Sequence, residues 1–107
     1  MSDPGQLNRR LVLEAPVEVD DGAGGVTRGY QAVATLWASV TPVSAQDEYA
    51  AARLGVRVTH RIGLRMLSTI TPRHRLRDGG TIYRIVSFRD RDGSGRFLDI
   101  TAEQRID

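Results

Sequence analysis

The chain has 107 residues, a formal net charge of +2 and 40% hydrophobic residues, which is the size and composition of one compact domain spanning 1–107. It contains no cysteine, so a disulfide framework and thiolate metal or redox chemistry are excluded. No apolar run approaches the about 18 residues of a membrane helix, and the start "MSDPGQLNRR" has no apolar stretch after its charges, so we expect neither a signal peptide nor a membrane partner.

The first third of the chain predicts two strands joined by a tight turn. Residues 1–8 should form a flexible start, because Pro4 and Gly5 interrupt regular structure. The stretch "RRLVLEAPVEV" (9–19) alternates as a strand that ends or bends at Pro16. The glycine-rich "DDGAGG" (20–25) is typical of a turn that needs positive φ.

The stretch from 26 to 43 predicts one or two strands, of which 34–43 has the clearest pattern. Leu36, Ala38 and Val40 share one face there, and Trp37 lies on the other.

Segment 44–55 then predicts a short helix. Ser44 and Asp47 resemble a capping box, and Gly55 closes the far end. The alternative for 44–55 is a loop that becomes ordered only against a partner.

Residues 56–66, "VRVTHRIGLRM", predict a strand with one apolar face and three arginines on the other: Arg57, Arg61 and Arg65. We call these three the arginine row.

The last third of the chain predicts a connector and two more strands. Residues 68–80 form the connector, which turns at 78–80, and "TIYRIVSF" (81–88) is a strand covered on both faces. "DRDGSG" (90–95) is a hairpin turn before a closing strand, 96–104.

This order of elements predicts an all-β fold. At this size, five to six strands with short turns favour a small antiparallel β-barrel, because a barrel leaves no exposed sheet edge. One short helix or ordered loop near 44–55 would accompany the barrel.

The sequence offers little for catalysis or for a bound group. His60 and His74 fall in different elements, and His60 lies on the apolar face of its strand, where a partly buried imidazole is expected. No nucleophile elbow or phosphate-binding loop is present. Residues 90–101 resemble a calcium loop only loosely, because Thr101 stands where a glutamate is needed. We therefore predict no enzyme, no catalytic residue, no cofactor and no metal.

Charge is unevenly distributed along the chain. All fifteen basic residues are arginine, which binds carboxylates and phosphates through two parallel hydrogen bonds, although a GC-rich genome also produces this bias. Seven arginines and no acidic residue lie between Tyr49 and Arg77. The arginine row could be a solvated sheet face, a contact for nucleic-acid phosphates, or a contact for carboxylates such as Asp99 and Glu103 of a neighbouring subunit.

The ordered set of motifs resembles the head–tail joining, or head-closure (stopper), proteins of long-tailed phages and of gene transfer agents. The resemblance covers about residues 5–104 and rests on seven stretches: "GQLNRRLVLEAP", "DDGAGGV", "LWASVTP", "DEYAAARLG", "THRIGLRM", "RHRLRDGGTIYRIVSFRD" and "RFLDITAEQ". The chain departs from the family at one place. Only Tyr30 stands where the family often has a second large aromatic before Trp37, which leaves the register of the second strand open.

The resemblance implies a structural role in the neck of a virion that is assembled in the cytoplasm of a bacterial host. Such proteins form a homo-oligomeric ring below the portal and adaptor proteins, close the channel that holds the packaged double-stranded DNA, and dock the tail through its terminator or tube protein. Sixfold and twelvefold rings both fit this resemblance.

On this basis the candidate protein interface comprises Arg57, Arg61, Arg65, Asp99 and Glu103. Segment 44–55 is the candidate for a change on assembly, and residues facing a DNA channel would be Arg53, Arg73, Arg75 and Arg77. The alternative function is a small basic-faced barrel that binds nucleic acid without sequence specificity, which would bind free duplex DNA with a steep dependence on salt.

Overall fold

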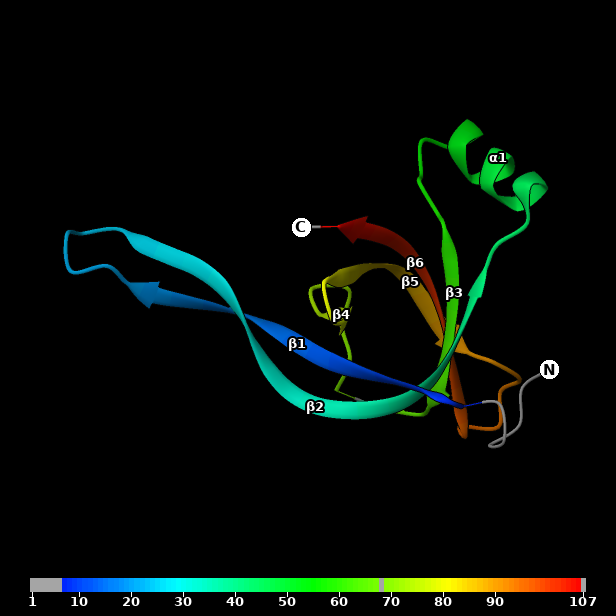
Figure 1. The fold of residues 1–107 in the computed structure, drawn as a ribbon, viewed down its shortest axis with the longest axis horizontal. Coiled ribbons are helices and arrows are strands. Elements are labelled where there is room, and N and C mark those ends of the chain that lie inside the picture. Colours follow the sequence, from blue (N-terminus) through cyan, green and yellow to red (C-terminus); the bar gives the residue numbers. More distant parts are fainter. Residues whose placement is uncertain (1–6, 68, 107) are drawn as a thin grey trace.

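The computed structural model describes residues 7–67 and 69–106, and these form a closed antiparallel barrel with two projections (Figure 1). The elements are β1 (Arg9–Asp20), β2 (Val26–Pro42), α1 (Ala45–Arg53), β3 (His60–Arg65), β4 (Arg75–Asp78), β5 (Thr81–Asp90) and β6 (Phe97–Ile106). The strand order around the barrel is β1-β2-β3-β6-β5-β4. The predicted small all-β barrel with one short helix is confirmed.

The barrel is filled by aliphatic side chains from every strand. The largest fully buried ones are Leu11, Leu13, Ile62, Leu64, Leu76, Ile85 and Ile100, and β2 contributes the fully buried Ala38. They alternate with outward residues because a strand turns successive side chains to opposite faces. The predicted inward set of Leu36, Ala38 and Val40 belongs to this core or packs against it, and Trp37 on the other face is exposed.

The first projection is the outer half of the β1–β2 hairpin, 15–20 and 26–32, which we call the arm. The pairing of β1 with β4 stops at Glu14, whereas its pairing with β2 continues to Asp20 opposite Val26. The arm therefore leaves the barrel as a two-stranded ribbon (Figure 1). At its tip, Gly22 and Gly24 have positive φ, as the turn prediction required.

The second projection is α1, which stands between β2 and β3 (Figure 1). Ser44 caps its start by accepting a hydrogen bond from the Asp47 amide at 3.1 Å. Its end is closed by Gly55 at φ +78° and by backbone hydrogen bonds, in which the amides of Leu54 and Val56 donate to the Ala51 carbonyl and that of Gly55 donates to the Ala52 carbonyl. The helix predicted for 44–55 is thus present, and it buries none of its own residues.

The strand predicted for 9–19 is present as β1. It does not end at Pro16, because an edge position tolerates proline and from that point β1 pairs only with β2. Two other expectations about strand limits are wrong. The strand predicted for 56–66 is shorter, β3, since residues up to Val56 complete the helix end. The connector predicted for 68–80 contains β4, which is held between β1 and β5.

The start of the chain was expected to be flexible over residues 1–8. Residues 1–6 lie outside the described part of the chain, while Leu7 is buried against the barrel. In 7–67 and 69–106, no helix is both long enough and apolar enough to cross a membrane.

Candidate functional site

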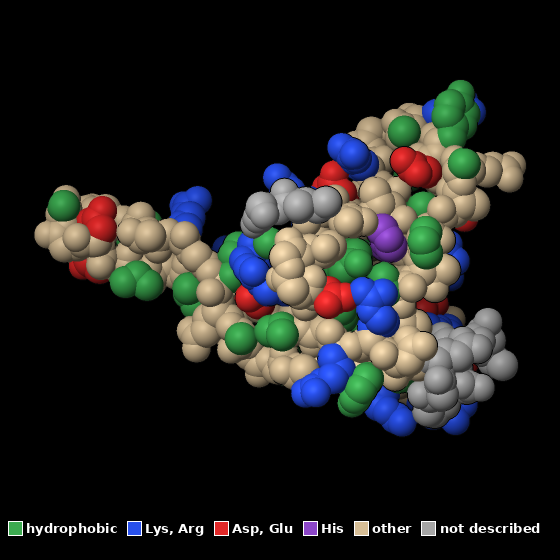
Figure 2. Space-filling model, in the orientation of Figure 1, with side chains coloured by type: hydrophobic (Ala, Val, Ile, Leu, Met, Phe, Trp, Pro, Cys, Tyr) green, Lys and Arg blue, Asp and Glu red, His purple; other side chains and the backbone are tan. Residues whose placement is uncertain are grey.

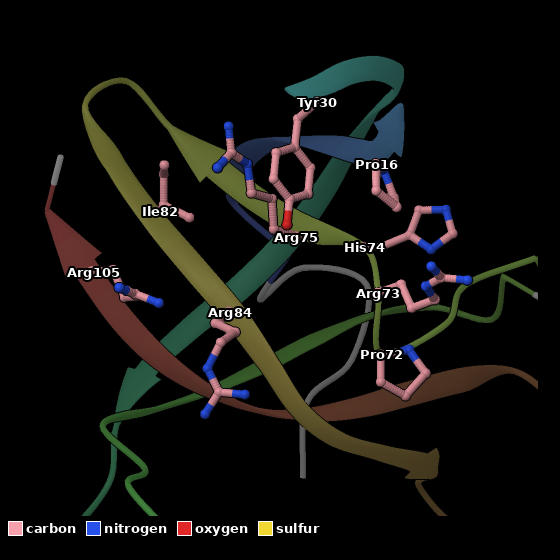
Figure 3. Close-up of a pocket in the computed structure, with 9 residues that line it drawn as sticks. All are labelled: Pro16, Tyr30, Pro72, Arg73, His74, Arg75, Ile82, Arg84 and Arg105. Carbon is pink, nitrogen blue, oxygen red and sulfur yellow. The ribbon is translucent and has the colours of Figure 1, made fainter. Parts of the chain in front are cut away.

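Arginine side chains gather in a hollow of about 530 Å³ on the outer face of the barrel, beside the base of the arm. Figure 3 shows that its walls come from β1, β2, the segment before β4, and strands β4, β5 and β6. We call it the arginine hollow. Its lining residues are Pro16, Tyr30, Pro72, Arg73, His74, Arg75, Ile82, Arg84 and Arg105.

Glu14 organises one wall of the hollow. It is buried at 8% exposure, and its Oε1 and Oε2 lie 2.7 Å from Nε of Arg75 and 3.1 Å from Nε of Arg77. The register places Glu14 opposite Arg75 across β1 and β4, so the charges share one face. The guanidinium carbon of Arg75 also lies 3.7 Å from the ring centroid of Tyr30, a cation–π contact.

Glu103 likewise pairs with two arginines, on the opposite wall of the hollow. Its Oε1 accepts from Nε of Arg84 at 2.9 Å, and its Oε2 lies 3.7 Å from Nε of Arg57. Arg84 is exposed and lines the hollow, whereas Arg57 lies in the segment between α1 and β3. Glu103 therefore joins the hollow to the first member of the arginine row.

Arg73 and His74 occupy the segment that enters β4. The Thr71 amide donates to Nδ1 of His74 at 3.1 Å, and the His74 amide donates back to the Thr71 carbonyl. This closed turn holds Arg73 exposed at the rim of the hollow. Among the described residues, no carboxylate lies within ion-pair distance of Arg73 or Arg105.

Two of the three members of the arginine row lie on one strand. Arg61 and Arg65 are exposed on β3, and Arg57 precedes that strand. Within residues 7–67 and 69–106, neither Arg61 nor Arg65 has a carboxylate within 4 Å. Arg61 lines a second hollow beside β5 and β6, and Arg65 lines another with Leu7 and Trp37.

The two acidic residues proposed for the interface have arginine partners in their own chain. Asp99 on β6 accepts from Arg91, with Nη2 at 2.6 Å and Nε at 2.8 Å from its Oδ1, and Glu103 pairs with Arg84 and Arg57. An interface that used these carboxylates would share or exchange the pairs that they make here.

The residues proposed to face a DNA channel do not lie together. Arg73 and Arg75 line the arginine hollow, and Arg77 is next to them through Glu14. Arg53 lies in the last turn of α1, outside that lining. Arg75 and Arg77 belong to the strand β4, whereas the sequence predicted a connector over 68–80.

The histidines and the acidic turn have structural partners. His60 is partly buried, with Nδ1 2.9 Å from the Thr59 hydroxyl and its ring edge-on to Tyr83. Burial lowers the pKa of His60, and the charge of Arg9 lowers it further. In the turn after β5, Asp90 accepts from the Gly93 and Gly95 amides. In the part of the chain that the structure describes, no group of three or more metal-binding side chains occurs.

Both projections carry exposed apolar side chains. Figure 2 shows hydrophobic side chains on the arm and at the outer end of α1, with arginines over the barrel between them. The large exposed ones in the described chain are Val19, Val26 and Tyr30 on the arm, Tyr49 and Leu54 on α1 and at its end, and Val33 and Trp37 on the part of β2 beyond the arm. Leu54 is 83% exposed at the end of α1.

Sequence reasoning missed three residues that line the hollow: Tyr30, which stacks on Arg75, and Arg84 and Arg105. It also missed Glu14, the charge that holds two arginines beside the hollow. The alternation of β5 did contain a signal, because Arg84 stands between the buried Tyr83 and Ile85 and must point outward.

Comparisons with known proteins agree with this fold. The family model described as phage head completion protein matches residues 2–105. A chain in the structure of the virion of a native gene transfer agent particle is 31% identical, with a TM-score of 0.63, and the alignment covers 94% of this chain and 96% of that one.

The solution structure of protein SF1141 from Shigella flexneri 2a has a TM-score of 0.77 at 23% identity, covering 96% of both chains, and at that identity it indicates the fold alone. No match was found among curated proteins.

Proposed function

Because the chain belongs to the phage head completion protein family, we propose that it is a structural component of the head–tail connector of a tailed phage or gene transfer agent. The observation that carries this proposal is the match over residues 2–105 combined with 31% identity to a chain of a gene transfer agent virion. The role is mechanical: the protein binds its neighbours and catalyses no reaction.

In this proposal, copies of the chain form a ring in the neck, below the portal and adaptor proteins. A ring requires that each subunit present two different, complementary faces. The exposed arginines of β3 on the barrel and the two projections supply such faces, because none of them is covered in the isolated chain. The candidate interface remains Arg57, Arg61, Arg65, Asp99 and Glu103, with Glu103 linking the row to the arginine hollow.

The ring closes the channel of packaged double-stranded DNA and offers a docking surface to the tail terminator or tube protein. The helix α1 and its exposed Leu54 suit an element that packs only in the assembly. Arg53 on α1 and Arg73 at the hollow rim are the strongest phosphate contacts of the proposed channel set. Arg75 and Arg77 are already engaged by Glu14.

The proposal is tested by omitting the gene from cells that produce the particle. We expect heads of normal size that contain little stable DNA and carry no tails, counted by negative-stain electron microscopy and by nuclease-protected DNA. A plasmid copy of the wild-type gene should restore tailed particles. Tailed, DNA-filled particles in the absence of the protein would contradict the proposed function.

The arginine hollow also favours a second candidate, a barrel that binds nucleic acid without sequence specificity. That function requires the purified chain to bind duplex DNA, with an affinity that falls steeply as salt rises. The connector function expects weak binding by the free chain. A filter-binding titration at two salt concentrations distinguishes the two candidates.

A further inference from the structure

Among the described residues, the carboxylates beside the arginine hollow neutralise less positive charge than its arginines carry. Four arginines line it. Two of them are paired, and each partner carboxylate is shared with an arginine outside the lining: Glu14 with Arg77 and Glu103 with Arg57. The other two, Arg73 and Arg105, have no carboxylate within ion-pair distance in the described chain. The hollow is therefore built to receive an anionic group.

The tip of the arm carries the opposite charge. Asp20 and Asp21 stand at its end, and Glu18 follows one step closer to the barrel, where Arg28 lies 3.7 Å from it. Within the tip, the amides of Gly22, Ala23 and Gly25 donate to the Oδ1 atoms of the two aspartates. These bonds fix the turn, and among the described residues no donor is bound to the Oδ2 atom of either carboxylate.

The tip of the arm is also small. Five residues, 21–25, connect β1 to β2, and three of them are glycine. Val19 and Val26 beside the acids are 60% and 52% exposed, which adds apolar area that docking would cover.

The tip does not reach the hollow of its own chain. Pro16 and Tyr30 line the hollow at the base of the arm, and the ribbon runs from there away from the barrel (Figure 1). At about 3.3 Å per residue, the tip lies more than 10 Å further out. An acidic arm tip that occupies the hollow must therefore belong to another molecule.

We propose that the acidic arm tip of one copy docks in the arginine hollow of the next copy. This contact joins two different surfaces, so it is heterologous and repeats from subunit to subunit until the ring closes. Carboxylates that meet guanidinium groups form charge-assisted hydrogen bonds of fixed geometry, which would set the angle between neighbours. The inference rests on the proposed function because it assumes a ring of this chain.

Cysteine cross-linking tests the contact directly, because the natural chain has no cysteine. One copy carries Ala23→Cys at the tip, and a second copy, distinguished by a size tag, carries Pro72→Cys, which lines the hollow and leaves every arginine in place. Both are produced together in particle-forming cells. A short bismaleimide applied to purified particles should give the mixed dimer, which can form only between different copies.

The matched control pairs Pro72→Cys with Ala50→Cys on the exposed face of α1, and it should give at least tenfold less mixed dimer. Particles that contain both cysteine chains, with both thiols reactive toward a monomaleimide, but without the tip-to-hollow dimer would overturn this inference and leave the proposed function standing. Particles that lack the chain altogether would overturn both.

A charge exchange separates a protein tip from DNA as the occupant. Asp20→Arg alone and Arg105→Asp alone should each lower incorporation into particles several-fold, and the double variant should recover most of it. If Arg105 instead met DNA phosphates, Asp20→Arg would not rescue Arg105→Asp. Absence of rescue, with both variants folded by circular dichroism, would rule out the docking contact.

Discussion

Glu14 is the charged residue that the described chain buries, and its position explains much of the local order. A buried carboxylate is stable only when it is paired and hydrogen-bonded. Arg75 and Arg77 meet that need from the same face of β4. The same contacts fix the two guanidinium groups at the edge of the arginine hollow.

Replacing Glu14 by Ala should destabilise the barrel by about 2–3 kcal/mol, because two partly buried arginines lose their common acceptor. Urea denaturation measures this change. The control is Glu18→Ala on the arm, whose exposed pair with Arg28 should be worth less than about 1 kcal/mol. Equal midpoints for the two variants would contradict the role of Glu14.

His60 makes stability depend on pH. Its pKa in the folded chain lies below its ordinary value of 6.5, because burial disfavours the charged imidazole. The unfolded chain therefore binds more protons below about pH 6.5, so stability should fall as the pH drops from 7.5 to 5.5. The variant His60→Gln should lose less over that interval in urea titrations, and parallel curves for the two proteins would refute this account.

At the scale of elements, the two projections differ from the barrel in what holds them. The barrel strands bury aliphatic side chains, whereas α1 buries none and is maintained by its caps. A helix of nine residues is marginal by itself in water. The arm similarly relies on its own two-strand pairing and its glycine turn.

We therefore expect the amides of α1 to exchange faster than those of β5 and β6 in the isolated chain, and to slow at least tenfold in the assembled particle. Hydrogen exchange read by mass spectrometry measures this. Ser44→Ala should weaken the helix by about 1 kcal/mol and leave the denaturation midpoint of the barrel almost unchanged. Equal protection of 44–55 in both states would mean that α1 has no partner.

At the scale of the whole molecule, charge is arranged over a shape 50 Å long, with the arm tip acidic and the barrel surface beside the arm basic. Such separation favours association in one orientation. A single exposed ion pair contributes about 0–1 kcal/mol, so only a set of pairs repeated around a ring would stabilise an assembly.

Changing Arg57, Arg61 and Arg65 together to Ala should prevent assembly with the ring partners at physiological salt, as measured by co-sedimentation. The barrel should remain folded, because these side chains are exposed. The triple change to Lys is the matched control. It keeps the charge but not the paired hydrogen bonds of arginine, so it should assemble to an intermediate extent. Full assembly of the Ala variant would show that the arginine row is not part of the interface.

The sequence by itself determined the features that depend on neighbouring residues. The glycine turn at 20–25, the cap at Ser44, the end of the helix at Gly55 and the shared inward face of Leu36, Ala38 and Val40 are all confirmed. Each of them follows from local φ preference, from one local hydrogen bond or from the two-residue period of a strand.

The tertiary structure alone decided what depends on closure of the barrel. It made β4 a strand, because Leu76 pairs with Leu13 on one side and Tyr83 on the other. It also fixed the register of β2, which the sequence had left open, with Leu11 opposite Leu36. The arginine hollow draws on residues as distant as Pro16 and Arg105, so no local pattern contains it: only the pairing of strands far apart in the chain brings those charges to one face.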